Sequence, residues 1–281
     1  MTSYQIVGFT RLEDVLRQLR HTGAKTAFIN GGTDFINNCG GREAELVIDL
    51  SQVADLNYIT DYGCEIRIGA GTTFRTIAAS PVIQAKVTAL AQAAGQVGSV
   101  QIRNRATIGG NIASASPAGD SLPVLAACNA RVSTAGITGS RLLTLAEALH
   151  GLQAKELITE IIIPTPGSSR SGFVKIGSRS QVTIARISLA AMIHYDCENR
   201  FIIAGKAALG AVGKVPVCPA SIQEFLTHRP VNQDFAAELA VLLAAAVDEA
   251  ITGRASHPYK KAIVKGLAYD VSGLLFDVGQ Q

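Results

Sequence analysis

The sequence predicts an α+β fold of two domains, and three observations support this prediction. The chain has 281 residues, 48% of them apolar, which is long and apolar enough for two folded units. Its first part alternates helical and strand-like patterns, whereas its last third gives strands first and helices afterwards. Between them, 165–171 is rich in proline, glycine and serine. We therefore expect domains at 1–168 (α/β subdomains at about 1–55 and 56–168) and at 169–281.

The first elements form a small α/β unit followed by a hairpin. Apolar residues recur at helical spacing in 11–20, which predicts a helix. The segment 25–32 is predicted to be a buried strand that ends in a glycine pair, and 45–51 a second short strand. In 57–73 two apolar runs flank the turn Asp61–Gly63, which predicts a β-hairpin.

The middle of the chain is predicted to be mostly helical around one glycine-rich loop. Helices are expected at 73–80 and 86–98. The next segment, 105–120, has almost no bulky apolar residues, so we expect an irregular loop there. A helix is expected to resume at 121–130, and 156–164 reads as a strand that a proline closes.

Beyond the boundary segment the pattern predicts an antiparallel sheet and then two helices. Three strands are expected at 172–178, 186–196 and 201–213, the last two joined by a turn at 198–200. The helices are expected at 234–251 and about 256–276.

Composition and charge exclude several classes of partner. The formal net charge of +3 is small for this length, so nothing indicates binding to nucleic acid or to a membrane surface. Trp is absent and aromatic residues are few, which argues against a base-stacking platform. The five cysteines show no CxxC spacing, so they support no metal or cluster site and fit a reduced, cytoplasmic chain. The N-terminal residues lack the pattern of a secretory signal, and charges interrupt the apolar segment 235–250, so no membrane span is expected.

The first candidate binding motif is "FINGGTDF" at 28–35. A strand that ends in two glycines, followed by Thr33 and Asp34, can point successive backbone N–H groups into one concavity that suits a phosphate. The Thr33 hydroxyl adds a donor, and Asp34 can cap the following helix. An ordinary strand-to-helix turn explains the same residues, and short glycine motifs by themselves are weak signals.

The second candidate is the loop "RATIGGNIASASPAGD" at 105–120. Two adjacent glycines allow a tight turn with free amides, and short polar side chains recur at close spacing. Asp120 is positioned either to cap the next helix or to accept from a ribose or flavin group. A diphosphate-bearing ligand needs many such neutral donors. A glycine-rich loop packed on itself accounts for the residues equally well.

No motif for catalysis by the chain itself is found. The glycine pattern GxGxxG and the Gly-Lys-Ser/Thr of a phosphate loop are both absent. The five histidines are dispersed, and no Ser, His and acid are joined by a known signature. The sequence therefore predicts a cofactor holder without catalytic side chains, in which the cofactor carries out the chemistry.

Both motifs together resemble a known family. The pair "NGGTDF" and "QIRNRATIGGNIASASPAGDSLPVLAA" is similar to the FAD-binding subunit of molybdenum hydroxylases, the relatives of xanthine dehydrogenase and carbon monoxide dehydrogenase. The stretches "FVKIGSR", "AALGAVGKVPV" and "SHPYKKAIVKGLAYD" resemble the C-terminal domain of that family, so the resemblance covers nearly the whole chain. It implies a vanillyl-alcohol-oxidase (PCMH) type FAD-binding fold at 1–168 and, at 169–281, a three-stranded antiparallel sheet with helices.

The resemblance also implies which residues bind FAD. The first bend takes the diphosphate, the second takes the diphosphate and ribityl region from the other side, an aliphatic side chain covers the flavin ring, and a lysine lies near the cofactor. Relatives often carry a small apolar residue where this chain has Asn30, which changes the contact with the cofactor at that position. The matching positions are Phe28, Ile29, Asn30, Gly31, Gly32, Thr33, Asp34 and Phe35 in the first bend, Thr107, Ile108, Gly109, Gly110, Asn111, Ser114, Ser116 and Asp120 in the second, then Ile158 for the ring and Lys175 for the lysine.

The resemblance further implies a place in a larger enzyme. In such complexes a molybdenum-cofactor subunit oxidises the substrate, an iron–sulfur subunit passes the electrons on, and FAD delivers them to NAD⁺ or another acceptor. Molybdopterin and iron–sulfur clusters are expected on the partner subunits, and the assembly is expected to be a heterotrimer or its dimer. A stand-alone FAD-dependent reductase of the same fold and an assembly subunit that has lost FAD are the alternatives.

Overall fold

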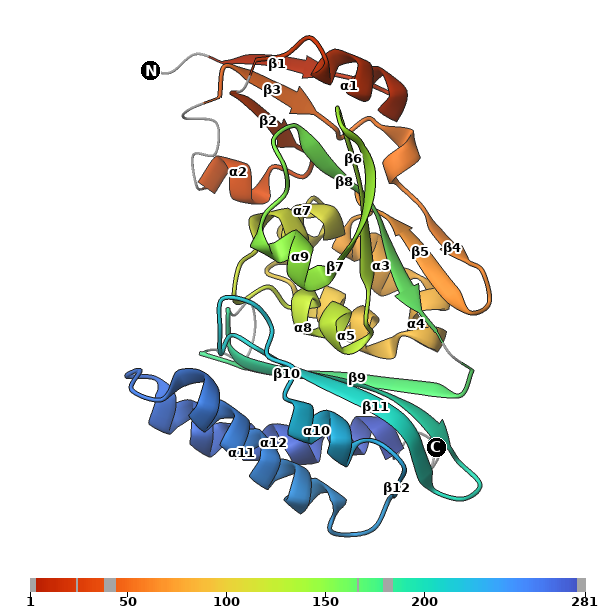
Figure 1. Cartoon of the computed structure of the whole chain (residues 1–281), viewed down its shortest axis with the longest axis vertical. Helices are drawn as coiled ribbons and strands as arrows, with labels where there is room; N and C mark the ends of the chain where they lie inside the picture. Colours follow the sequence, from red (N-terminus) through yellow and green to blue (C-terminus); the bar gives the residue numbers. More distant parts are fainter. Residues whose placement is uncertain (1–3, 24, 38–43, 166, 179–183, 277–281) are drawn as a thin grey trace.

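The computed structural model describes residues 4–23, 25–37, 44–165, 167–178 and 184–276. Its strands form three sheets that follow one another along the long axis of the molecule (Figure 1). The parallel sheet of the N-terminal residues lies at one end, the antiparallel sheet of the middle residues lies next to it, and the C-terminal sheet and its helices lie at the other end. None of the described helices combines the length and the apolar run that a bilayer crossing needs.

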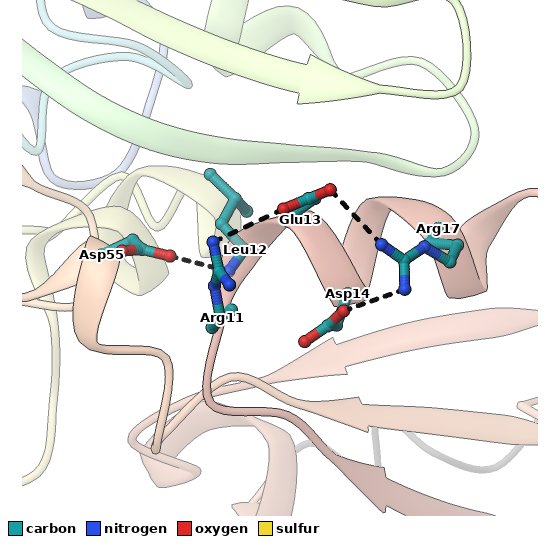
Figure 2. A network of polar contacts seen from close by, with 6 residues as sticks. All are labelled: Arg11, Leu12, Glu13, Asp14, Arg17 and Asp55. Carbon is teal, nitrogen blue, oxygen red and sulfur yellow. Dashed lines mark hydrogen bonds and ion pairs between the residues drawn. The ribbon is translucent and has the colours of Figure 1, made fainter.

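The N-terminal sheet has three parallel strands in the order β1-β3-β2, namely β1 (Gln5–Gly8), β2 (Thr26–Ile29) and β3 (Leu46–Asp49). Helix α1 (Leu12–Leu19) covers it with its buried side chains, and the short helix α2 (Thr33–Asn37) follows β2. The N–H of Leu12 donates to the Asp55 carboxylate at 2.8 Å, which fastens the start of α1 to η1 (Ala54–Leu56) (Figure 2). The ion pairs of Arg17 with Glu13 and Asp14 lie on the solvent side and stabilise the fold little.

The middle sheet has five strands in the order β4-β5-β8-β6-β7, and every pair in it is antiparallel. The expected hairpin and the expected strand at 156–164 are both confirmed, whereas β6 and β7 were not expected. The strands are β4 (Ile59–Asp61), β5 (Glu65–Gly69), β6 (Arg131–Gly136), β7 (Gly139–Thr144) and β8 (Glu156–Pro164).

Short helices cover one face of the middle sheet and supply half of the buried residues in the cluster of apolar side chains between them and the sheet. The expected helices at 73–80, 86–98 and 121–130 are confirmed as α3, α5 and α8, each with shorter bounds. The set is α3 (Phe74–Ala79), α4 (Pro81–Lys86), α5 (Thr88–Gln96), α6 (Val100–Arg103), α7 (Ile108–Ser114), α8 (Ser121–Ala127) and α9 (Leu145–His150).

The prediction of an irregular loop across 105–120 is wrong for its centre, because Ile108–Ser114 forms the helix α7. The Thr107 hydroxyl accepts from the N–H of Gly110 at 3.2 Å and so caps the helix, while Ile108 and Ile112 are buried. Ala115 has a left-handed backbone at φ 47° and ends the helix. One capping side chain and two buried isoleucines are sufficient for a helix that contains two glycines.

The C-terminal sheet is antiparallel, in the order β12-β11-β10-β9, and its three long strands confirm the prediction. One face packs on α12, which packs in turn on α11, and the other face packs on α5 and α8 of the middle unit (Figure 1). The elements are β9 (Ser169–Gly177), β10 (Ala185–Asp196), β11 (Phe201–Gly210), α10 (Ala220–Phe225), β12 (Arg229–Pro230), α11 (Phe235–Ile251) and α12 (His257–Phe276).

Candidate functional site

The two predicted bends lie against each other although they are more than 70 residues apart in sequence. A Cβ atom built on Gly31 would lie 2.0 Å from the carbonyl oxygen of Arg105, so the two backbones are in direct contact. A cavity of about 660 Å³ opens between the bends, within the 300–1,000 Å³ or so that ligand sites usually have. All eight residues of the first bend line it, together with Thr107, Gly110, Asn111, Ser114, Ser116 and Asp120 of the second.

The first bend presents unpaired backbone donors to this cavity. β2 ends at Ile29 and α2 begins at Thr33, and between them Gly32 takes a φ of 76°, which glycine adopts without strain. The first N–H of this turn with a backbone acceptor is that of Ile36, which donates to the carbonyl of Gly32. Among the described residues, none accepts from the N–H groups of 31–35. Such amides at the start of a helix suit an anionic ligand.

The second bend differs, because its amides are already used within the fold. The N–H of Gly109 donates to the Ala70 carbonyl at 2.9 Å, that of Gly110 to the Thr107 hydroxyl, and that of Asn111 to the Thr107 carbonyl. The prediction that Gly109 and Gly110 offer free amides is therefore wrong. What this bend presents to the cavity is a set of polar side chains.

The glycines of the second bend have different neighbours. A Cβ atom on Gly109 would come within 2.6 Å of the Ala70 Cβ, so this glycine permits close packing of α7 on the middle sheet. Among the described residues, a Cβ atom on Gly110 would meet the Thr107 hydroxyl alone, at 3.0 Å. Gly110 is exposed and lines the cavity, so a side chain there would enter the space available to a ligand.

Asn111 is held in place by the next helix. The Ser121 hydroxyl donates to its side-chain oxygen at 2.7 Å, and the Ser114 hydroxyl donates to its backbone carbonyl at 3.2 Å. These bonds fix the Asn111 side chain at the wall of the cavity without occupying its amide nitrogen.

Asp120 lies where the second bend meets the C-terminal sheet. Its carboxylate accepts from the Lys175 ammonium at 2.6 Å, and both side chains are almost fully buried. The other carboxylate oxygen is buried and has no hydrogen-bond partner in the part of the chain that the structure describes, which is a costly arrangement. Burial raises the pKa of the Asp120 carboxyl to about 6, although the Lys175 charge opposes the shift. Asp120 is the first residue before α8, but its side chain caps nothing.

Four of the residues named from the family resemblance do not line the main cavity, namely Ile108, Gly109, Ile158 and Lys175. Ile158 is buried on β8 and lines an adjoining hollow of about 110 Å³, which shares Asn30 and Gly110 with the main cavity. Lys175 pairs with Asp120 on the cavity wall and also donates to the Gln96 carbonyl at 2.8 Å, and Ile108 belongs to the apolar core beneath the cavity.

Other lining residues were not predicted, because their role depends on the folded arrangement. Val97 and Gly98 reach the cavity from the end of α5, and the Arg103 guanidinium donates to both carbonyls, at 3.1 and 2.9 Å. Gly98 has a φ of 44°. In the sequence, Gly98 stands shortly before the second bend, which was the one indication that this segment lines the cavity. No binding motif surrounds it.

The sequence matches known families and proteins over most of its length. Residues 2–166 match the family described as the FAD binding domain in molybdopterin dehydrogenase, and residues 173–273 match the CO dehydrogenase flavoprotein C-terminal domain. The chain is 32% identical to the nicotinate dehydrogenase FAD-subunit of Eubacterium barkeri, over 86% of this chain and 85% of that protein. It is 26% identical to the glyceraldehyde dehydrogenase medium chain of Sulfolobus acidocaldarius, over 79% and 80%.

Solved structures give the same fold. A chain of the Cu,Mo-CO dehydrogenase superposes with a TM-score of 0.86 at 21% identity, covering 98% of both chains. A chain of quinoline 2-oxidoreductase from Pseudomonas putida 86 superposes with a TM-score of 0.83 at 20% identity, covering 96% of this chain and 95% of that one. The three-sheet arrangement is therefore shared with these enzymes.

Proposed function

The chain belongs to the family of FAD-binding subunits of molybdenum hydroxylases, and from this we propose that it relays electrons from an iron–sulfur subunit through FAD to NAD⁺ or another acceptor. The observation that carries the proposal is a cavity that is lined by both bends, although they are distant in sequence. A long dinucleotide needs donors on both sides, and the two bends supply them.

The residues present fit FAD in three respects. The cavity volume is within the usual range for ligand sites. The amides of 31–35 lack acceptors among the described residues, and a diphosphate would supply them. One buried oxygen of the Asp120 carboxylate has no partner within the described ranges, and a hydroxyl or N–H group of the cofactor would satisfy it.

We assign the diphosphate to the first bend. The N–H groups of Gly31, Gly32 and Thr33 and the Thr33 hydroxyl would hold its oxygens, close to the positive end of α2. Phe28, Ile29 and Asn30 lead into this bend, and Asp34 and Phe35 complete its far side. Asn30 adds a side-chain donor close to the cavity.

The second bend would hold the remainder of the cofactor through side chains. The hydroxyls of Thr107, Ser114 and Ser116 and the amide of Asn111 are spaced to meet the diphosphate and ribityl oxygens. Gly110 leaves room for the ligand, while Ile108 and Gly109 hold α7 on the middle sheet.

Asp120, Lys175 and Ile158 would position the flavin end. Lys175 keeps the Asp120 carboxylate oriented and partly neutralised, so that its unpaired oxygen can accept from the cofactor. Ile158 offers an apolar side chain in the adjoining hollow that would cover one face of the ring. When bound, FAD supplies the redox chemistry, since a flavin exchanges electrons singly or in pairs. The chain binds and orients FAD and needs no acid or base of its own.

The proposed partners are separate iron–sulfur and molybdenum-cofactor subunits, in a heterotrimer or its dimer. The match to a protein named as an FAD-subunit, over 85% of its length, supports a subunit that carries FAD alone. The cysteines among the described residues are unpaired, which supports a cytoplasmic location.

The test is to purify the complex from its native host and to measure FAD, iron and molybdenum in each subunit. We expect one FAD on this chain, the metals on the partners, and reoxidation of the reduced flavin when NAD⁺ or another acceptor is added without oxygen. A chain that carries no FAD and takes up none when it is supplied would contradict the proposal.

A further inference from the structure

A second hollow, of about 320 Å³, lies apart from the candidate FAD cavity, and none of the described residues lines both spaces. It forms where the end of α8, the start of β6, the junction of β7 with α9 and the segment that follows β11 meet. Its volume lies at the lower end of the range for ligand sites, which favours a small molecule over a dinucleotide.

Most of the wall of the second hollow is apolar and is fixed by the fold. Leu125 and Leu145 are buried and belong to the apolar cluster of the middle unit. The segment 215–218 is held to β11 by two hydrogen bonds between the backbones of Leu209 and Val217, at 2.8 and 2.9 Å. A ligand with an apolar body would therefore displace water from a surface that is already in place.

Two cations, Arg131 and Lys206, line this apolar wall. The Lys206 ammonium donates to the Asn129 side-chain oxygen at 2.7 Å, and the Arg131 Nε donates to the Leu143 carbonyl at 3.3 Å, so neutral groups hold both. Neither cation forms an ion pair with another of the described residues, and no Asp or Glu among them lines the hollow. Charges of one sign against apolar walls attract a counter-ion.

The surrounding fold does not supply that counter-ion. The Arg131 charge acts on the Glu147 carboxylate, but that carboxylate already accepts from the N–H and the hydroxyl of Thr144, at 2.6 and 2.7 Å. Lys206 lies near the C-terminal end of α8, where a cation is favourable. That helix has only 7 residues, and its carbonyls at 124–126 already accept from the N–H groups of 128–130.

We propose that the second hollow binds a small apolar carboxylate, such as an aromatic or medium-chain acid. Its carboxylate would pair with the Arg131 guanidinium and the Lys206 ammonium, while its apolar body would lie on the wall that Leu125 and Leu145 form. This inference goes beyond the proposed function and does not depend on it, because the hollow and the FAD cavity are separate spaces.

The experiment uses the full chain loaded with FAD, and the probe is octanoate. Cys218 is exposed and lines the second hollow, so an occupant should slow its alkylation by iodoacetamide, which mass spectrometry of its peptide measures. Cys64 is exposed in the turn between β4 and β5 and serves as the internal control. We expect octanoate to protect Cys218 and not Cys64. Octan-1-ol, which has no charge, should need a roughly tenfold higher concentration for the same protection.

The double variant Arg131→Gln/Lys206→Gln tests the two cations. Partial burial raises the pKa of the Cys218 thiol and the Lys206 charge opposes the shift, so each protein is compared with itself, with and without octanoate. We expect the half-protecting concentration of octanoate to rise roughly tenfold or more. The matched control, Lys261→Gln/Lys265→Gln, removes the same charge from α12, across the C-terminal sheet from α8, and should behave as the wild type.

A third variant fills the hollow and keeps both cations. Ala146 is exposed on α9 and lines the hollow, so Ala146→Leu adds bulk at the wall without disturbing the core. We expect octanoate to protect Cys218 less well in this variant, while its unfolding free energy stays unchanged. This measurement decides the matter even if the double variant does not fold.

Several results would overturn the site. These are a wild-type chain in which octanoate does not protect Cys218, equal protection of Cys64, and full protection in Ala146→Leu. An equal loss of protection in both double variants would reduce the effect to net charge. Equal protection by octan-1-ol would show an apolar hollow without a carboxylate site, which also refutes the proposal.

Discussion

The two bends of the candidate site have similar glycine-rich sequences and use their backbones in opposite ways. In the first bend, the N–H groups of 31–35 have no acceptor among the described residues. In the second, the N–H groups of Gly109, Gly110 and Asn111 all donate within the fold. The first bend is therefore suited to bind an anion through its backbone, and the second to position side chains and to leave space.

The difference shows that a glycine motif does not define its own role. Gly31 and Gly109 both allow two backbones to approach closely, since a Cβ atom on either would overlap a neighbour. Gly110 differs, because a Cβ atom there would extend into the cavity. The contacts of each glycine thus decide whether its replacement affects the fold or the ligand.

The largest expected effect is on stability, from replacing Gly31. The Gly31→Ala variant would force a methyl group against the carbonyl of Arg105, where it would lie 2.0 Å away. We expect the FAD-free protein to lose more than about 3 kcal/mol of unfolding free energy, measured by urea denaturation. Gly95→Ala is the control: it lies within α5 with no atom near its Cβ position, and it should stabilise by roughly 0.5–1 kcal/mol. Equal stability of the two variants would show that the bends are not in contact.

The next effect concerns the end of the second bend and depends on pH. Burial raises the pKa of Asp120 from 3.8 to about 6, so the folded state binds this proton more tightly than the unfolded state does. Proton binding by Asp120 therefore stabilises the folded state. This contribution to the unfolding free energy is complete below about pH 4 and is lost as the pH rises through about 6.

We therefore expect the unfolding free energy of the wild type to fall relative to Asp120→Asn by on the order of 2 kcal/mol between these pH values. Denaturation of both proteins across that range measures it. The Asp120→Asn variant leaves Lys175 without its carboxylate and should be less stable at every pH. The test is therefore the change of the unfolding free energy with pH, and not the constant difference between the two proteins. Parallel curves would mean that Asp120 titrates normally.

The smallest effects separate the two threonines. Thr107→Val removes the cap of α7 and should lower the unfolding free energy of the FAD-free chain by about 1 kcal/mol. Thr33→Val should leave that stability unchanged and weaken FAD binding by about 1.5 kcal/mol, or roughly tenfold in Kd. Denaturation and flavin titration of both variants measure the two quantities. If Thr33→Val binds FAD as tightly as the wild type, the first bend does not hold the diphosphate through this hydroxyl.

Local patterns predicted the long regular elements well. The strand at Glu156–Pro164 and the last two helices follow from apolar periodicity and from a closing proline, which act over neighbouring residues. The hairpin of β6 and β7 was missed because polar residues that pair at long range stabilise it. Thr134 and Arg141 both donate to the Glu156 carboxylate, which no local pattern indicates.

The candidate site was likewise predictable from local motifs, but not where it depends on contacts between distant residues. Both motifs were found, and the structure brings them to one cavity. Whether the amides of Gly109 and Gly110 are free depends on Ala70 and on the cap by Thr107, which only the fold shows. The ion pair of Asp120 with Lys175 joins residues from two domains and requires the packing of the C-terminal sheet.

The most direct test of the central claim is FAD retention in a graded series at Gly110. Gly110→Ala and then Gly110→Val add increasing bulk at the wall of the cavity, where only the Thr107 hydroxyl is near. The measurement is the amount of FAD bound per purified chain, with the stability of the FAD-free protein recorded alongside. We expect partial loss of FAD in the Ala variant and complete loss in the Val variant, in chains that remain folded. A folded Val variant that stays fully loaded would show that the cofactor does not lie between the two bends.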